Sequence, residues 1–268
     1  MEPFAPLGRE GETSRLSLTG WDGEGVSAGF TTRQAGNVAL HVGDDPARVI
    51  ERRRAVAEAL GWDFAVWTCG EQVHGAEASV VRREDAGKGR LDRDSAFQDT
   101  DAFVTNEPGV LLVQYFADCV PLYFHDPVTG AIGLAHAGWK GTVADIAGRA
   151  VARMAETYGT RPADLRAAIG PSIGACCYEV DDVVIRRVLP MAEDKPVLHP
   201  TADGKARLDL KELNRHLMIK AGILPSRIEM SSWCTSCRTD LFFSHRAEKG
   251  KAGRMMSWLG RKKEVTLP

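Results

Sequence analysis

Residues 109–136, GVLLVQYFADCVPLYFHDPVTGAIGLAH, form the apolar centre of the chain and decide its fold. Residues 110–115 and 122–124 are rich in branched and aromatic side chains, which predicts two buried strands. They are followed by Asp-Pro-Val-Thr-Gly at 126–130, a sequence typical of a turn. We therefore expect residues 131–135 to return as the second strand of a hairpin.

Outward from this centre, apolar periodicity predicts strands and helices along the rest of the chain. Helices are expected over 48–60, 143–158 and 181–189, and a strand that leads into a helix over 208–222. Strands are expected over 26–31, 64–68, 77–82, 101–105, 165–169, 228–233, 241–244 and 254–259. Without an internal repeat or a linker, the sequence predicts an α+β fold. We expect one compact domain over residues 15–264, with a central mixed β-sheet and flanking helices, after a loose leader over 1–14.

The composition is typical of a globular protein, with 268 residues, 44% hydrophobic and 26% charged. The 34 basic residues nearly cancel the 36 acidic ones, so no nucleic-acid partner is expected. The N-terminus lacks the pattern of a secretory signal, and the apolar stretch 109–124 is too short to span a membrane. We expect a cytoplasmic protein without a membrane partner, whose six cysteines are reduced thiols or ligands.

Three short segments, two of which contain glycine, carry the residues of a candidate metal site. They are Gln-Val-His-Gly at 72–75, Ala-Asp-Cys at 117–119 and His-Ala-Gly-Trp at 136–139. His74, Cys119 and His136 would supply three ligands and leave a fourth position open, which is typical of catalytic rather than structural zinc. Taken singly, each has a simpler explanation, because most histidines only donate hydrogen bonds and free cysteines are commonly buried.

Two carboxylates are candidates for general acid–base catalysis. Asp118 lies in an apolar run directly before Cys119, and burying a carboxylate without a partner is costly. It therefore needs a cationic neighbour, a hydrogen-bonding network or a functional cleft. Glu179 follows an aromatic residue and lies close to Gly174 in the sequence.

A glycine-flanked helix start follows His136, in Gly-Trp-Lys-Gly at 138–141. The N-terminus of a helix favours anions such as phosphate, so Lys140 and Gly141 are candidate substrate-binding residues. His41, in a His-Val-Gly-Asp-Asp turn, and His245, in Phe-Phe-Ser-His-Arg, are further candidates for the pocket.

The pair Cys234-Thr-Ser-Cys237 has the spacing of a redox pair or of half a zinc ribbon. A ribbon needs a second pair of similar spacing. The adjacent Cys176 and Cys177 are not expected to supply it, since neighbouring cysteines do not chelate as a Cys-x-x-Cys turn does. A purely structural role for these cysteines is favoured.

Five ordered motifs resemble those of the laccase-domain family, also called polyphenol oxidase-like and described as purine nucleoside phosphorylases. The similarity runs from about Gly29 to Gly260. The motifs are Gln-Val-His-Gly, Ala-Asp-Cys-Val-Pro, Ala-His-Ala-Gly-Trp-Lys-Gly, Gly-Pro-Ser-Ile-Gly-Ala-Cys-Cys-Tyr-Glu-Val, and Cys-Thr followed by Phe-Phe-Ser-His-Arg.

This resemblance implies that His74, Cys119 and His136 are the metal ligands and that the fold is a compact α+β domain. It implies phosphorolysis of adenosine and inosine, cleavage of methylthioadenosine, and deamination of adenosine. Arg33 matches the family's Thr-Arg motif at the substrate site, in a segment that ends at Asn37 and is shorter than usual, so Arg33 and Asn37 are expected to bind substrate. Lys140 replaces a common arginine, which keeps the charge but loses bidentate phosphate binding.

The histidine count limits the redox chemistry that this chain can perform. A four-copper laccase needs on the order of ten histidine ligands, whereas the chain has seven histidines in total. One copper in the His₂Cys site could still give weak polyphenol oxidase activity, since copper binds such sites more tightly than zinc does. A zinc ion suits purine chemistry better, because it activates water for deamination.

We therefore expect a zinc enzyme, with copper as the alternative metal, that acts on purine nucleosides with phosphate. We expect it to be a monomer or a small homo-oligomer. Two other interpretations remain. Cys119 could be the catalytic nucleophile of a metal-free Cys-His amidohydrolase, or the trio could be an inert zinc node in an interaction protein.

Overall fold

The computed structural model describes residues 1–7, 14–202 and 204–262. Its helices are α1 (Pro46–Ala59), α2 (Trp139–Val143), α3 (Ile146–Tyr158), α4 (Asp182–Ala192) and α5 (Leu210–Lys220). Its strands are β1 (Phe4–Pro6), β2 (Arg15–Leu18), β3 (Val26–Thr31), β4 (Trp67–Cys69), β5 (Ala78–Val80), β6 (Ala102–Thr105), β7 (Leu111–Phe116), β8 (Val120–His125), β9 (Ile132–Ala137), β10 (Arg166–Ile169), β11 (Glu179–Val180), β12 (Leu198–Pro200), β13 (Ala206–Leu208), β14 (Ile228–Met230) and β15 (Met255–Arg261).

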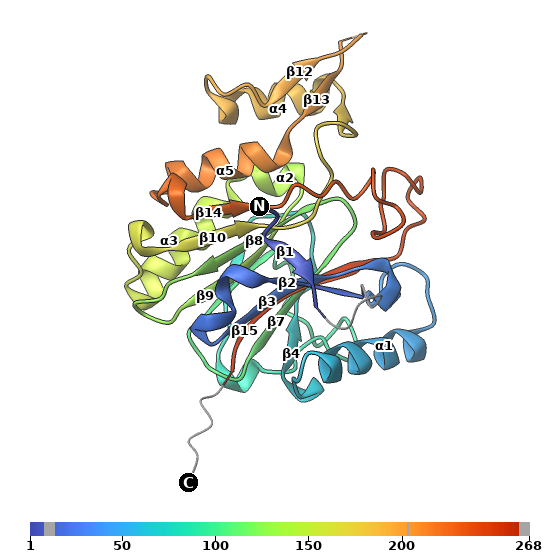
Figure 1. Cartoon of the computed structure of the whole chain (residues 1–268), viewed down its shortest axis with the longest axis vertical. Coiled ribbons are helices and arrows are strands. Elements are labelled where there is room, and N and C mark those ends of the chain that lie inside the picture. The colour runs from blue at the N-terminus through green and yellow to red at the C-terminus, as the bar shows by residue number, and fades with distance from the viewer. Residues whose placement is uncertain (8–13, 203, 263–268) are drawn as a thin grey trace.

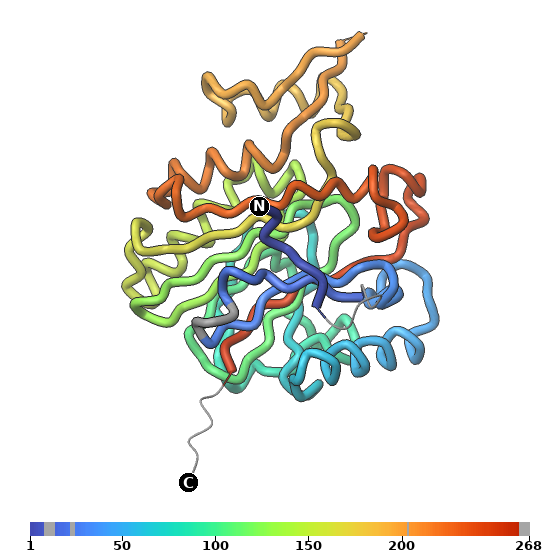
Figure 2. The backbone as a smooth tube through the Cα atoms, viewed as in Figure 1, coloured from blue at the N-terminus to red at the C-terminus, as the bar shows by residue number. Residues whose placement is uncertain are grey.

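These elements confirm the α+β class, but the strands divide between two large mixed sheets instead of forming one. The first sheet has the order β1-β2-β3-β15-β7-β4 and the second β14-β10-β8-β9-β6-β5. Strand β15, near the end of the chain, pairs with β3 on one side and β7 on the other (Figure 2). A third, three-stranded sheet (β11-β13-β12) lies with α4 at one end of the molecule (Figure 1).

The central stretch 109–136 crosses from one sheet to the other. Strand β7 belongs to the first sheet, whereas β8 and β9 form the expected antiparallel hairpin in the second. The hairpin turns where Asp126 accepts the backbone N–H of Val128 and Gly130 adopts a positive φ of 72°. The segment between β7 and β8, which contains Cys119, is therefore the point at which the chain changes sheets.

Side-chain alternation in these strands builds a four-layer arrangement. On β7, Leu112 packs in the core between the two sheets, whereas Leu111 packs on the opposite face against α1. On β8, Tyr123 faces the same central core, whereas Leu122 packs against α3 and α5. Helix α1 therefore covers the outer face of the first sheet, and α3 and α5 cover that of the second (Figure 1).

Three sequence-based expectations need correction. The leader is not loose at Phe4–Pro6, which pair with β2 while Phe4 is buried; residues 8–13 lie outside the described residues. The helix after Gly138 is broken, because Asp145 adopts a φ of 60° and caps α3 through its carboxylate. Residues 241–244 do not form a strand, because the N–H groups of Leu241 and Phe242 donate to the carbonyl of Arg238 in a turn. None of the described helices is long and apolar enough to cross a membrane.

Candidate metal centre and active site

The structure brings together His74, Cys119 and His136 from three separate segments. His74 lies in the loop between β4 and β5, Cys119 between β7 and β8, and His136 in β9. Their candidate ligand atoms all lie within 4.8 Å of one another, and the two imidazole rings meet edge to face. The donor set therefore fits a single metal ion with three protein ligands.

Two of these ligands lie at or beside residues with a strained backbone conformation. His74 has a φ of 61° and Asp118, next to Cys119, a φ of 83°, and both values are rare for residues other than glycine. The loop at His74 is held by Asp101, whose carboxylate accepts the backbone N–H groups of Val73, His74 and Gly75. Hydrogen bonds to a buried carboxylate thus offset the strain at the first ligand.

Glycine at position 138 lets a third segment approach the site. A Cβ added there would lie 2.9 Å from the Cδ2 of His74 and 3.2 Å from the Sγ of Cys119. Any other residue would push the two ligands away, so the glycine of His-Ala-Gly-Trp is a packing requirement of the metal centre.

Asp101 also orients the third ligand. Its Oδ1 lies 2.8 Å from the Nδ1 of His136, which leaves the Nε2 of that ring for a metal. This carboxylate–histidine pair is the usual support of a metal-binding imidazole. Asp101 is fully buried, and although burial opposes its charge, the hydrogen bond and charge of His136 keep its pKa below the usual value.

Cys119 and His136 each stabilise the charged form of the other. Burial alone would raise the pKa of Cys119, but His136 and His74 outweigh it and lower that pKa to about 6. Burial likewise opposes the charged form of His136, yet Cys119 and Asp101 raise its pKa to about 9. A thiolate near neutral pH is the form that binds metal or acts as a nucleophile.

The three ligands line one cavity of about 420 Å³, within the size range of small-molecule sites. Its positive charge comes from Lys140, Arg246 and Arg254. Trp139, Tyr178, Ile173 and Leu210 add aromatic and aliphatic surface to the same lining. The remaining lining residues are His41, Gln72, Tyr115, Ala117, Asp118, Gly138 and His245.

Arg33 does not line this cavity, contrary to the expectation from its motif. Its guanidinium donates to the carbonyls of Thr239 and Phe242 and lies 3.8 Å from the carboxylate of Glu248. It also stacks over the ring of Phe243. Arg33 therefore holds the 239–248 segment in place.

The two candidate acid–base carboxylates differ sharply in position. Asp118 lines the cavity, but its Oδ1 accepts from the Thr235 hydroxyl, and its Oδ2 from the Ser244 hydroxyl and the N–H of Arg246. Glu179 lies outside the lining, is exposed, and pairs with Lys205 at 3.5 Å. Glu179 does not line the cavity, whereas its neighbour Tyr178, which follows the turn at Gly174, does.

The other candidate substrate-binding residues also divide into those that line the cavity and those that do not. His41, Lys140 and His245 line the cavity, whereas Asn37 and Gly141 do not. Asn37 accepts the backbone N–H of Arg254 and so positions one of the cavity's cations. A Cβ added to Gly141 would lie 2.7 Å from the carbonyl of Gly75, so this glycine permits close packing against the ligand loop.

Sequence reasoning missed Asp101, Tyr178, Arg246 and Arg254. Two of them had a signal, since Tyr178 and Arg246 directly adjoin the residues chosen from the same motifs. A lone aspartate before the buried strand β6 was a weaker sign of Asp101. Arg254 carried no local signal.

Comparisons with known proteins identify related sequences and structures. A sequence model of the family described as "Multi-copper polyphenol oxidoreductase laccase" matches residues 21–262. The chain is similar to purine nucleoside phosphorylase YlmD of Geobacillus stearothermophilus, with 44% identity over 90% of this chain and 92% of the relative.

A crystal structure of YlmD from the same organism superposes with a TM-score of 0.94 at 41% identity, over 98% of this chain and 100% of that one. The chain is also 33% identical to adenosine deaminase RL5 of an unknown prokaryotic organism, over 89% of this chain and 95% of the relative.

Proposed function

This chain belongs to the multi-copper polyphenol oxidoreductase laccase family, and we propose that it is a zinc-dependent purine nucleoside enzyme. It cleaves the glycosidic bond of adenosine, inosine and methylthioadenosine with phosphate, and it deaminates adenosine. One observation carries the proposal: a three-ligand metal centre and three cationic side chains share a single cavity of about 420 Å³. Relatives named purine nucleoside phosphorylase and adenosine deaminase support the same reactions.

The donor chemistry of the cavity fits zinc. Two imidazoles and one thiolate, with one imidazole supported by the Asp101 carboxylate, form a typical set for a catalytic zinc ion. When bound, zinc would supply Lewis-acid polarisation and activation of water for deamination. His74, Cys119 and His136 would hold it.

The cavity's cations suit a phosphate co-substrate. Phosphorolysis requires phosphate to attack the anomeric carbon while the purine leaves, so an anion must be held beside the ribose. Arg246 and Arg254 are fixed by hydrogen bonds from their guanidinium groups to backbone carbonyls, and Lys140 adds a third charge to the lining. Preorganised charge of this kind lowers the barrier without reorganisation during the reaction.

The rest of the lining suits the nucleoside. Trp139 and Tyr178 offer aromatic faces for a planar base, and the guanidinium of Arg246 lies over the Tyr178 ring at 5.3 Å. His41 is exposed as a whole, but desolvation of its ring, aided by the charge of Arg254, lowers its pKa to about 4. His41 is therefore neutral at physiological pH, and it can both donate and accept a hydrogen bond to the substrate.

We assign Asp118 a positioning role. Both of its carboxylate oxygens are occupied by donors from the 235–246 segment. Through these bonds it fixes the backbone of Arg246 beside Cys119. Such a carboxylate has little capacity left to take a proton from substrate.

Copper oxidase chemistry has less support. Among the described residues, the groups able to hold a metal contain two histidines in total, His74 and His136, far fewer than a multi-copper centre needs. A metal-free Cys-His hydrolase is the second candidate, because the pKa of Cys119 is lowered to about 6 beside His136.

A substrate panel tests the proposal. Metal-replete protein is incubated with adenosine, inosine and methylthioadenosine, with and without phosphate, and free base and ammonia are measured. We expect phosphate-dependent release of base from all three and ammonia from adenosine. Untouched nucleosides, together with rapid oxidation of phenols by copper-loaded protein, would overturn it. The expected cytoplasmic location and oligomeric state stay predictions.

A further inference from the structure

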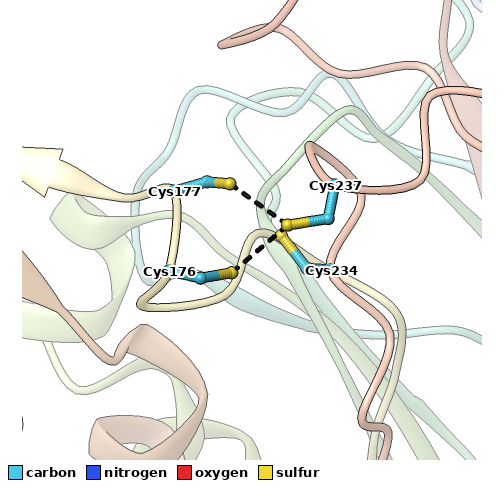
Figure 3. Close-up of side chains that lie close together, drawn as sticks. All are labelled: Cys176, Cys177, Cys234 and Cys237. Carbon is cyan, nitrogen blue, oxygen red and sulfur yellow. Dashed lines mark hydrogen bonds between the residues drawn. The ribbon is translucent and has the colours of Figure 1, made fainter.

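A second group of metal-ligating side chains lies outside the metal trio, the name we give to His74, Cys119 and His136. Cys176 and Cys177 come from the segment after β10, and Cys234 and Cys237 from the segment after β14. Their sulfur atoms point toward one another (Figure 3) and all lie within 4.8 Å of each other. We call these four residues the cysteine cluster.

The sulfur spacing matches a tetrahedral metal site better than a disulfide. The Sγ of Cys237 lies 3.5 Å from that of Cys176 and 3.4 Å from that of Cys177. A Zn–S bond of about 2.3 Å places the sulfurs of a tetrahedron about 3.8 Å apart, whereas a disulfide needs about 2.05 Å. All four cysteines are free thiols in this structure.

The neighbouring pair can chelate because its backbone is a turn. The N–H groups of Cys177 and Tyr178 both donate to the carbonyl of Gly174, so the segment curls and both sulfurs lie on one side. In an extended strand they would point to opposite faces. The sequence-based expectation is that the adjacent Cys176 and Cys177 do not supply a second pair of ligands beside the Cys-x-x-Cys pair. The geometry of the turn contradicts its premise, because both sulfurs face the same side.

Polar groups around Cys234 favour the thiolate form of this cysteine. The N–H of Gly174 donates to the Sγ of Cys234 at 3.2 Å, and a Cβ at Gly174 would lie 3.2 Å from the Sγ of Cys176. The buried ammonium of Lys211 donates to the carbonyls of Ser231 and Trp233, close to Cys234 in the chain. Hydrogen bonds and nearby positive charge of this kind support metal-bound thiolates.

We propose that the cysteine cluster is a second metal site, a structural tetrathiolate zinc site that joins the 171–180 and 231–247 segments. Four protein ligands close the coordination sphere, so this zinc takes no substrate. Cys176 and Cys237 are exposed, so the metal enters from the surface.

The joined segments form one wall of the cavity. Ile173 and Tyr178 from the first segment, and His245 and Arg246 from the second, all line it. Thr235, inside the Cys-x-x-Cys pair, donates to Asp118, and Arg246 donates to the carbonyl of Cys177. A zinc ion here would therefore fix the cavity wall without entering the reaction.

The test counts zinc per chain in the full-length protein, purified under reducing conditions with zinc supplied. Wild type is compared with Cys119→Ala, with the double variant Cys176→Ser/Cys237→Ser, and with the matched control Cys69→Ala, whose cysteine belongs to neither site. We expect about two zinc ions in wild type and in the control, and loss of about one in each of the other two.

Wild-type zinc content in the double variant would overturn the proposal, as would wild-type protein whose only zinc is lost in Cys119→Ala. If the double variant does not fold, cobalt loading of Cys119→Ala gives a second reading. Strong sulfur-to-cobalt charge-transfer absorption is expected to persist there, and its absence refutes the site. A disulfide within the cysteine cluster, found by mass spectrometry of the native protein, also refutes it.

Discussion

The metal trio and the cysteine cluster use related donors in opposite ways. The trio places two imidazoles and one thiolate in the lining of a cavity, beside cationic and aromatic side chains. The cysteine cluster brings four thiols together at the surface, with two of them exposed. Three ligands leave a position for chemistry, whereas four close the site. The number of ligands and the access to the cavity therefore separate a reacting metal from a structural one.

Removing the central ligand of the trio should have the largest effect. Cys119→Ala is expected to lower nucleoside turnover by about 10³-fold, since a bound metal supplies several kcal/mol of stabilisation and each ~1.36 kcal/mol is tenfold in rate. Steady-state kinetics and zinc content measure this. Circular dichroism should be unchanged, because Cys119 lies outside the flanking strands. Retained activity would mean that the trio is not the reacting site.

Replacing Asp101, which supports the metal trio, should lower the affinity for metal. Asp101→Asn deletes the charge beside His136 and should weaken zinc binding by about 10- to 100-fold. A competition titration with a chromophoric chelator measures the change. Asp94→Asn, at an exposed carboxylate outside the cavity lining, is the matched control and should bind as wild type. Equal affinities of the two variants would remove Asp101 from the metal centre.

Arg254 lines the cavity whereas Arg33 does not, so we expect different effects when each is replaced. Arg254→Gln should raise the KM for phosphate by about 10- to 100-fold, because a charge-assisted hydrogen bond is worth about 1.5–3 kcal/mol. Arg33→Gln should leave that KM unchanged, since its guanidinium contacts the 239–248 segment rather than the cavity. The reverse result would restore the sequence-based assignment of Arg33.

The smallest expected effect is on stability. The thiolate of Cys119 and the imidazolium of His136 should make the unfolding temperature of the metal-free protein depend on pH. The lowered pKa of Cys119 gives stability that is lost as pH falls through about 6. The raised pKa of His136 gives stability that is lost as pH rises through about 9. The excess unfolding temperature of wild type over Cys119→Ser, both stripped of metal, should therefore peak between these values. A difference independent of pH would contradict the pairing.

The local features of this fold could be predicted from the sequence. The hairpin of residues 120–137 and helix α1 follow from runs and periodicity that need no knowledge of distant contacts. The division of strands between two sheets could not be predicted, because it depends on β15 inserting between β3 and β7. Pairings between distant strands leave no local pattern.

The same limit applies to the site. The metal trio was recognisable because each ligand lies in a short, distinctive motif, and two of these motifs contain glycine. The sequence indicates Glu179 as a candidate, but Tyr178 lines the cavity in its place, because the direction of each side chain after the turn at Gly174 leaves no pattern in the sequence. The cysteine cluster was missed because a turn at Gly174, rather than the spacing of its cysteines, brings their sulfurs together.

The central claim, that metal held by the trio drives purine nucleoside chemistry, is tested most directly by metal removal and return. Metal-stripped wild type is given inosine and phosphate, and hypoxanthine release is followed as zinc is added. We predict no release before zinc, full recovery with zinc, and release about 10³-fold slower than wild type at every zinc level in Cys119→Ala. Full activity in the stripped protein would instead identify a metal-free Cys-His enzyme, and no release from the zinc-loaded protein would refute the phosphorylase assignment.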